Sequence, residues 1–238
     1  MKASRLIAVA ALLAGTSLSA HAAPTTFFGE DLNANGGATP NSDAARASFF
    51  SNLTGVATEN FDSIAAGTSN PVLTFTGCCT ATLVGGGQIN NFSNAGRFAI
   101  SSPNYYETFA GSAGMTFSSP IAAFGFYATD IGDYGGQLTL TLTDTLANVT
   151  VLNVGNTVGS GGNTSGTALY FGFFDLTAQY TSIAFGNSSG GDGFGYDNLS
   201  VGSIQQVTPG GRVPEPITLS LFGAGLVGAA VMRRRRKA

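Results

Sequence analysis

The chain has 238 residues, of which 43% are hydrophobic, and a formal net charge of −3 at pH 7. Its single histidine is His21 and its lysines stand at positions 2 and 237, so residues 23–206 contain neither residue type. Nucleophilic centres that need an imidazole base and Schiff-base chemistry that needs a lysine are therefore excluded there. The same stretch is acidic, with Arg46 and Arg97 as its cations, which excludes binding to nucleic acid by charge.

Residues 1–22 have the three parts of a secretory signal peptide. A positively charged start precedes an apolar run over Leu6–Leu18, and Ala20-His21-Ala22 fits a small-x-small cleavage site. Because the run is short and ends in a cleavage pattern, we favour a signal peptide over a membrane span. We expect the mature chain to begin at Ala23, outside the cytoplasm.

One helix is expected near the start of the body, residues 23–206. Asn41 or Ser42 can cap it, and Ala45, Phe49 and Leu53 recur at helical spacing. The rest of the body predicts strands separated by turns rich in Gly, Ser and Asn.

The clearest strand pattern is in residues 137–144, where Leu138, Leu140 and Leu142 alternate with Thr139, Thr141 and Thr143. We expect a hairpin with 147–153, and a more central strand at 121–130. The other expected strands are 57–62, 72–76, 80–84, 97–100, 115–118, 168–174, 181–185 and 196–201. This pattern predicts a mainly β body, an antiparallel jelly-roll-like β-sandwich with one short N-terminal helix.

Acidic and amide residues in the first and last of these strands predict a structural Ca²⁺ site. Glu59 and Asp62 lie in the first strand, and Asp197 and Asn198 lie in the last. In jelly rolls these strands commonly neighbour one another, and oxygen ligands suit Ca²⁺. Local backbone bonds in turns or caps are the alternative. The stretch Asp130-Ile131-Gly132-Asp133 is a second acidic cluster, which we interpret as a plain turn.

Cys78 and Cys79 are the cysteines of the chain. Exported thiols oxidise, so we predict a disulfide between these two neighbours. Adjacent Cα atoms are about 3.8 Å apart across a trans peptide, below the usual disulfide span of about 4.4–6.8 Å, so the bond would be strained. An intermolecular bond and two unpaired thiols are the alternatives.

Three tyrosines are candidate ligand-binding residues: Tyr105, Tyr106 and Tyr134. Pro103-Asn104 precede the first two and Gly135-Gly136 follow the third, which indicates loops. Exposed tyrosine rings can stack on sugar faces. Ordinary anchoring of the loops is the alternative.

Residues 207–213 are expected to form a linker, and residues 214–238 predict a membrane-holding tail. An uncharged apolar run over 217–232 would span about 24 Å as a helix, which snorkelling arginines can extend towards a hydrocarbon core of about 30 Å. We therefore predict a single C-terminal transmembrane helix with its basic cluster in the cytoplasm. A buried helix of a soluble domain is the alternative. The motif residues are Val213, Pro214, Glu215 and Pro216, and the membrane-stop residues are Arg233, Arg234, Arg235, Arg236 and Lys237.

This tail resembles the PEP-CTERM sorting tail of exported bacterial proteins. The resemblance implies a transient anchor in the inner membrane, cleavage near Pro-Glu-Pro by an exosortase-type enzyme, and a mature form at the cell surface or outside the cell. The body, in residues 114–121, 124–127 and 193–199, is similar to the carbohydrate-binding-like sandwiches that often precede such tails.

We therefore expect a non-catalytic structural component of a polysaccharide-rich surface layer or biofilm matrix. Two alternatives remain. The first is a module that binds the exopolysaccharide. The second is a glycoside hydrolase that depends on a carboxylate pair, the catalytic class that needs neither histidine nor lysine.

Overall fold

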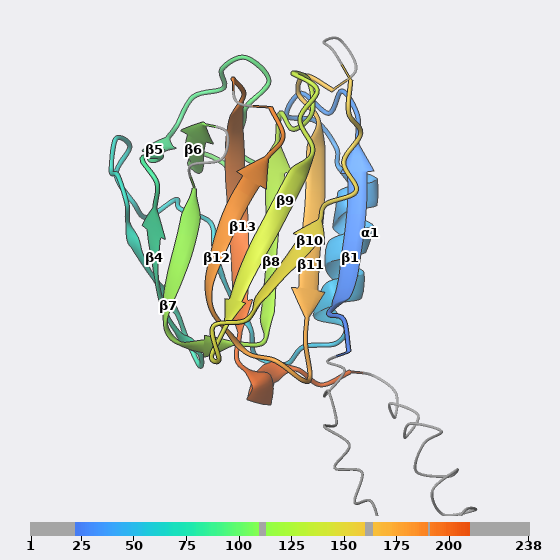
Figure 1. The fold of residues 1–238 in the computed structure, drawn as a ribbon. Helices are drawn as coiled ribbons and strands as arrows, with labels where there is room; N and C mark the ends of the chain where they lie inside the picture. Colours follow the sequence, from blue (N-terminus) through green and yellow to red (C-terminus); the bar gives the residue numbers. More distant parts are fainter. Residues whose placement is uncertain (1–21, 110–112, 160–163, 190, 210–238) are drawn as a thin grey trace, which may run out of the picture.

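The computed structural model describes residues 22–109, 113–159, 164–189 and 191–209. They form two antiparallel β-sheets with a shared core and one α-helix on the outside (Figure 1). A mainly β body with two antiparallel sheets and one N-terminal helix is therefore confirmed. The predictions for residues 1–21 and 210–238, including the sorting motif, the transmembrane helix and the basic cluster, lie outside the described residues.

The seven-stranded sheet has the order β1-β11-β8-β13-β6-β5, and β2 pairs with β13 beside this path. Its strands are β1 (Thr25–Asp31), β2 (Ala57–Glu59), β5 (Gln88–Asn90), β6 (Tyr105–Phe109), β8 (Ala123–Thr129), β11 (Ala168–Phe174) and β13 (Gly193–Gly202). The six-stranded sheet has the order β10-β9-β12-β7-β4-β3. Its strands are β3 (Val72–Phe75), β4 (Cys79–Val84), β7 (Gly114–Ile121), β9 (Leu138–Asp144), β10 (Val149–Asn153) and β12 (Tyr180–Asn187).

The core lies between the sheets and is built by alternation along the strands. Phe124 and Phe126 of β8 face it from the seven-stranded sheet, and Leu140 of β9 and Phe185 of β12 face it from the other. The Phe126 ring meets Phe185 edge to face, with 5.4 Å between the ring centroids. The expected hairpin is confirmed as β9–β10, and β8 is central in its sheet, as its apolar sequence predicted.

The helix α1 (Pro40–Phe50) covers the outer face of the seven-stranded sheet over β1 and β11 (Figure 1). Phe49 is fully buried there and packs over Gly125 and Gly172, where a Cβ atom would crowd its ring. The N-cap residue is Thr39, so the expected cap at Asn41 or Ser42 is wrong. Pro40 fits the first turn of the helix because that turn needs no N–H partner at this position.

The described chain begins and ends at the same end of the sandwich (Figure 1). This follows from the register, since β1, β11, β8 and β13 alternate in direction. Val207 pairs with Leu53 in an isolated bridge, and Thr208 N donates to Asn52 O at 2.7 Å, so the contacts of the body continue into the expected linker. Within the described ranges, no helix has the length and apolar character needed to cross a membrane.

Two parts of the fold differ from the sequence prediction. The strand expected at 97–100 is wrong: only an isolated bridge between Asn94 and Arg97 forms there. The strands β1, β5 and β6 were not predicted.

Candidate functional site

Three carboxylates gather at the end of the seven-stranded sheet opposite to the described chain ends. Thr129, the last residue of β8, pairs with Gly195 near the start of β13. Asp130 directly follows β8, Asp133 lies in the turn beyond it, and Asp192 directly precedes β13. Each offers a carboxylate oxygen, and these oxygens lie within 4.8 Å of one another. We call these three aspartates the acidic group.

The acidic group carries more negative charge than its surroundings balance. Asp130 and Asp192 are each 1% exposed, and Asp133 is partly buried. Arg97 Nη1 lies 3.6 Å from Asp130 Oδ2, while Arg97 Nε is bonded to Glu107 Oε1 at 2.6 Å. In the described part of the chain this guanidinium contacts two carboxylates, Glu107 and Asp130, and forms no ion pair with Asp133 or Asp192.

Two oxygens of the acidic group are buried without a hydrogen-bond donor in the described part of the chain, Asp133 Oδ1 and Asp192 Oδ2. The neighbouring oxygens do have donors: Asp192 Oδ1 accepts from Gly193 N at 2.8 Å, and Asp130 Oδ1 accepts from Gly166 N at 3.2 Å. A buried carboxylate oxygen without donor or cation is destabilising. The acidic group therefore has two buried carboxylate oxygens that could accept a hydrogen bond or bind a cation.

Burial and mutual repulsion both disfavour the charged forms of these carboxyls. Burial raises the pKa of Asp130 to about 7, and the charge of Asp133 adds to the rise against the opposing effects of Gly166 N and Arg97. Burial also raises the pKa of Asp192 to about 7, together with the charges of Asp133 and Asp130. Carboxyls perturbed in this way, in one cluster, are typical of functional sites.

The backbone of the turn after β8 aims these side chains. Asp130 has a positive φ of 66°, and Gly132 follows at 98°, a region that glycine adopts without strain. Gly96 lies against the group: a Cβ atom at this position would overlap Asp130 Oδ1. Close approach of the backbone thus explains a glycine at position 96.

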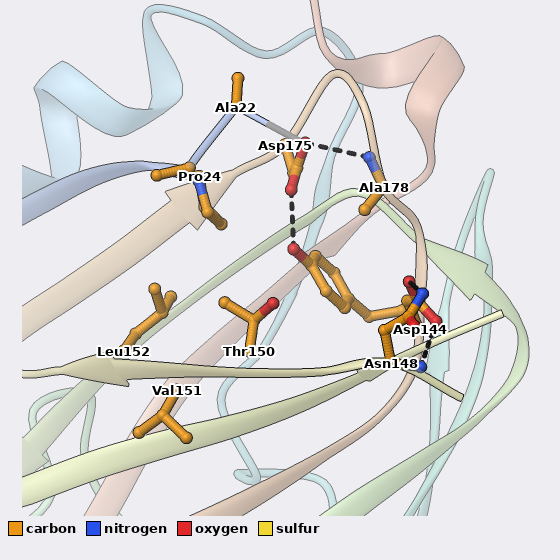
Figure 2. Close-up of a pocket in the computed structure, with 11 residues that line it drawn as sticks. Ala22, Pro24, Asp144, Asn148, Thr150, Val151, Leu152, Asp175 and Ala178 are labelled. Carbon is orange, nitrogen blue, oxygen red and sulfur yellow. Dashed lines mark hydrogen bonds between the residues drawn. The ribbon is translucent and has the colours of Figure 1, made fainter. Parts of the chain in front are cut away.

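A pocket of about 580 Å³ lies at the other end of the sandwich, beside the first described residues Ala22 to Pro24 (Figure 2). Two carboxylates line it, Asp144 and Asp175. Such a pair is what a glycoside hydrolase would need.

Asp175 is used by the turn that follows β11. Its Oδ1 accepts from Ala178 N at 3.0 Å, and its Oδ2 accepts from Tyr180 Oη at 2.7 Å (Figure 2). Its Oδ1 also accepts from Thr177 N at 2.7 Å. Burial acts to raise the pKa of Asp175, but the bonds from Tyr180 and Thr177 outweigh it, so the pKa is lowered. A general acid needs a raised pKa.

Asp144 closes the hairpin between β9 and β10. Its Oδ1 accepts from Leu146 N and Asn148 N, each at 2.8 Å, and its Oδ2 accepts from Asn148 Nδ2 at 2.8 Å. Both carboxylates of the pocket thus hold turns. This arrangement does not suit glycoside hydrolysis in this pocket.

A shallow hollow of about 290 Å³ lies on the outer face of the six-stranded sheet. It is lined by uncharged, mostly small side chains of β4, β7, β9 and β12: Val84, Ala113, Gly114, Met115, Thr116, Thr141, Thr143, Ser182, Ile183 and Ala184. The register places Thr141 opposite Ala184 and Thr143 opposite Ser182. The threonines of β9 therefore belong to a wider hydroxyl-bearing face, which we call the threonine face.

Asp197, one of the residues predicted to bind Ca²⁺, holds a loop. Its Oδ2 accepts from Ile100 N and from Ser101 N, each at 2.8 Å. Asn198 has a positive φ of 50° and lies where the register of β13 against β8 shifts. Burial raises the pKa of Asp197 to about 7, although these backbone donors act in the opposite direction.

Glu59 and Asp62 also accept backbone hydrogen bonds. Glu59 Oε1 accepts from Phe61 N at 2.7 Å, and Asp62 Oδ1 accepts from Asn104 N at 3.1 Å. The Glu59 bond is local, as in the alternative that the sequence left open, whereas the Asp62 bond joins segments far apart in the chain. Of the acidic side chains in the described ranges, the acidic group is the set whose oxygens come within 4.8 Å, and Glu59, Asp62 and Asp197 do not form such a set. Calcium at these residues stays a prediction.

Cys78 and Cys79 lie at the turn between β3 and β4 as free thiols with their Sγ atoms 2.9 Å apart. The hydrogen bond between them raises the pKa of Cys78, together with burial, and lowers the pKa of Cys79. The vicinal disulfide and its intermolecular alternative stay predictions.

The predicted exposure of two tyrosines is wrong. Tyr105 and Tyr106 lie in β6 and are 0% and 1% exposed. The Tyr106 ring stacks on Phe61 in the core, and Tyr105 Oη donates to Phe92 O at 3.0 Å on the opposite face. Tyr134 is 67% exposed, as its flanking glycines predicted. Only this tyrosine of the three can present its ring to a ligand.

Residues 212–236 match the family described as the PEP-CTERM protein-sorting motif. The chain therefore carries the sorting motif that its Pro-Glu-Pro, apolar run and basic cluster predicted. The motif implies an exported, membrane-anchored precursor that an exosortase processes.

No curated protein matches the chain. Among solved structures, the K2 cleaved adhesin domain of Lys-gingipain is similar with 15% identity and a TM-score of 0.39, over 61% of this chain and 97% of that one. The C-terminal family 22 carbohydrate binding module of a Clostridium thermocellum xylanase is similar with 13% identity and a TM-score of 0.36, over 66% of this chain and 96% of that one. The xylan-binding domain from Paenibacillus barcinonensis is similar with 9% identity and a TM-score of 0.37, over 64% of this chain and 95% of that one. TM-scores of this size establish no shared function.

Proposed function

We propose that the chain is a non-catalytic structural component of a polysaccharide-rich layer outside the cell. The observation that carries the proposal is the PEP-CTERM motif at residues 212–236, attached to an acidic β-sandwich. Two features support it. The sandwich has neither histidine nor lysine in residues 23–206, and the carboxylate pair of its pocket is engaged in turns.

In this proposal the tail is a sorting signal. The precursor is held in the inner membrane by residues 217–232, with the basic cluster 233–237 on the cytoplasmic side. Cleavage near Val213–Pro216 then releases the sandwich to the layer. Because the described chain ends beside its start, the acidic group lies on the end of the sandwich farthest from the attachment point.

Deleting Pro214-Glu215-Pro216 in the producing cell tests whether the tail is a sorting signal. We expect the deleted chain to stay in the inner-membrane fraction at precursor size, while the unchanged chain reaches the surface fraction. Equal amounts of both chains at the surface would contradict the proposal. Deleting three residues of the linker, 209–211, is the matched control and should leave delivery unchanged.

Retention in the layer is tested by removing the polysaccharide. We expect the mature protein to sediment with the surface layer of intact cells and to become soluble when the polysaccharide is digested enzymatically. A mature protein that is equally soluble before and after digestion would contradict a place in that layer.

A second candidate function is binding to a neutral polysaccharide on the threonine face. The observation that favours it is the hollow of about 290 Å³, lined by hydroxyl and aliphatic groups that suit an uncharged polymer. Thr141 lies within the hollow, and Leu146, 74% exposed, lies outside it in the β9–β10 turn.

Replacing these two residues with the same side chain separates binding from general surface charge. We expect Thr141→Lys to weaken binding to the producer's exopolysaccharide at least tenfold and Leu146→Lys to leave it unchanged, as measured by affinity electrophoresis. Absence of saturable binding by the unchanged chain, or equal effects of the two substitutions, would contradict polysaccharide binding on this face and leave the structural role as the remaining proposal.

A further inference from the structure

We propose that Asp130, Asp133 and Asp192 bind one divalent cation, and that this cation is Ca²⁺ in the exported protein. The site lies at the opposite end of the sandwich from the pocket and differs in every residue from the calcium site that the sequence predicted. It is independent of the proposed function, since neither sorting nor polysaccharide binding requires it.

The spacing of the oxygens fits one ion of this size. Ca²⁺ binds protein oxygens at about 2.3–2.6 Å, so two ligands on opposite sides of it lie about 4.8 Å apart. The three carboxylate oxygens of the acidic group lie within 4.8 Å of one another. The three oxygens are therefore close enough together for one ion to bind all of them after small side-chain adjustments, and backbone carbonyls and water can complete the shell.

Two buried oxygens without hydrogen-bond donors also point to a ligand at the acidic group. Asp192 is 1% exposed, yet its Oδ2 has no hydrogen-bond donor in the described part of the chain, and neither does the buried Oδ1 of Asp133. Both belong to carboxylates of the group. Elsewhere the fold supplies such atoms with backbone N–H donors, as it does for Asp175. One cation between the two carboxylates would coordinate both oxygens.

The protein's own cation does not fill this place. Arg97 donates through Nε to Glu107 Oε1 at 2.6 Å and reaches Asp130 Oδ2 at 3.6 Å through Nη1. Its Nη1 also approaches Gly193 O at 3.5 Å. Among the described residues, Arg97 forms no ion pair with Asp133 or Asp192. The guanidinium thus balances one side of the cluster, and two carboxylates remain for an ion.

The ligand chemistry favours Ca²⁺ over other metals. Zinc sites in proteins use sulfur and nitrogen ligands, and residues 23–206 have no histidine, while both cysteines lie in the other sheet at the start of β4. Mg²⁺ demands near-ideal octahedral geometry and retains several waters, which a buried group of carboxylates on irregular turns supplies poorly. Calcium accepts irregular oxygen shells.

A bound ion would tie together two segments far apart in the chain. The turn that carries Asp130 and Asp133 follows β8, and Asp192 precedes β13. Binding to the folded state alone stabilises it by mass action. We therefore infer that Ca²⁺ stabilises the end of the sandwich opposite to the described chain ends.

The full-length chain, purified in detergent and stripped with EDTA, tests the proposal directly. We expect calorimetric titration with CaCl₂ to give one site per chain with a Kd of about 10⁻⁴ M or tighter, and MgCl₂ to bind at least tenfold more weakly. With CaCl₂ at a hundred times its Kd, we expect the thermal unfolding midpoint to rise by about 5–10 °C.

Asp133→Asn is the decisive variant because Asp133 is the least buried of the three and the chain should fold without its charge. In EDTA we expect this variant to unfold at the same temperature as the unchanged chain or higher, since repulsion within the group is relieved. In CaCl₂ it should unfold at a lower temperature than the unchanged chain. A lost side-chain bond alone would lower the midpoint in both buffers.

Asp62→Asn is the matched control, because Asp62 belongs to the sequence-predicted calcium site. We expect it to retain the full rise in midpoint with CaCl₂, whatever its effect in EDTA. Three results would overturn the proposal: no rise for the unchanged chain, a full rise retained by Asp133→Asn, or a rise abolished by Asp62→Asn.

Discussion

Single carboxylates set the local geometry of this protein, and most of them do so by accepting backbone hydrogen bonds. Asp175 and Asp197 each accept two or more backbone N–H groups. Bonds of this kind to a charged acceptor are worth about 1.5–3 kcal/mol each. Asp133 Oδ1 and Asp192 Oδ2 stand out against this pattern because they are buried and no described residue donates a hydrogen bond to them. That contrast, more than the count of acidic residues, marks the acidic group as a site.

We predict that Asp175→Asn lowers the free energy of unfolding by about 1.5–3 kcal/mol at pH 7. The pKa of Asp175 is lowered in the folded protein, because bonds from Tyr180 and Thr177 outweigh the effect of burial. A lowered pKa stabilises the fold above the unfolded value of about 3.9, and this stabilisation is lost as the pH falls through the folded pKa. Urea unfolding at pH 7 and at pH 3 measures it. The loss should be smaller at pH 3, and an equal loss at both pH values would contradict the prediction.

At the scale of elements, the end of one strand caps the helix that follows it. Asp31, the last residue of β1, accepts from Asn41 N at 3.0 Å, from Ser42 N at 2.9 Å and from Ser42 Oγ at 2.7 Å. These backbone donors belong to the first turn of α1, which has no partner for them within the helix. A negative charge there is also favoured by the helix dipole. Asp31 therefore does from a neighbouring strand what an N-cap side chain usually does.

We predict that Asp31→Asn destabilises the fold by about 1–3 kcal/mol, because an amide replaces one acceptor with a donor that faces other donors. Guanidinium unfolding followed by circular dichroism measures the change. Glu30→Gln, the adjacent residue, is the control. Its carboxylate bonds Thr157 on the exposed surface, so we expect a loss of under about 1 kcal/mol. Equal losses for the two variants would contradict the capping role.

The most clearly predicted strands are those with a strong local pattern of apolar residues. The alternation of Leu and Thr in β9 gives a strand with one buried face, and the apolar run of β8 gives a central strand. β6 was interpreted as a loop because Tyr105 and Tyr106 follow Pro103-Asn104. Both its faces are buried, since the segment that includes Phe92 covers the side away from the core. Coverage by a loop from elsewhere in the chain leaves no periodic signal in the strand itself.

The strand expected at 97–100 failed for a related reason. Its backbone is satisfied by side chains: Ile100 N donates to Asp197, and Phe98 N donates to Thr129 Oγ1 at 3.4 Å. Local composition does not reveal such partners. Apolar residues in that segment thus indicated burial correctly but the kind of element wrongly.

At the scale of the whole molecule, the pairing of β8 with β13 creates the acidic group. Asp130 and Asp133 are close in sequence and were noted as a cluster, but Asp192 joins them only through the antiparallel register of Thr129 with Gly195. The signal that could have found it is an acidic residue at each facing end of two expected strands. That inference needs the strand order, which a single sequence does not provide. The sorting motif, by contrast, is a local signal, and the match at residues 212–236 confirms that prediction.

In the proposed function, the two ends of the sandwich have different roles. The described chain starts and stops at one end, beside the pocket that contains Asp175, and the acidic group occupies the other. In the proposed function, attachment at one end would leave the threonine face and the acidic group free to contact the surrounding layer. This division depends on the central claim that the chain is exported and then cut from its tail.

The intact mass of the protein recovered from the surface layer tests that claim most directly. We predict a chain that begins at Ala23 and ends within or close to Val213–Pro216, so that residues 217–238 are absent. The precursor with its tail should be found only in the inner-membrane fraction. Surface protein that still carries Arg233–Lys237, or full-length protein confined to the cytoplasm, would contradict the account.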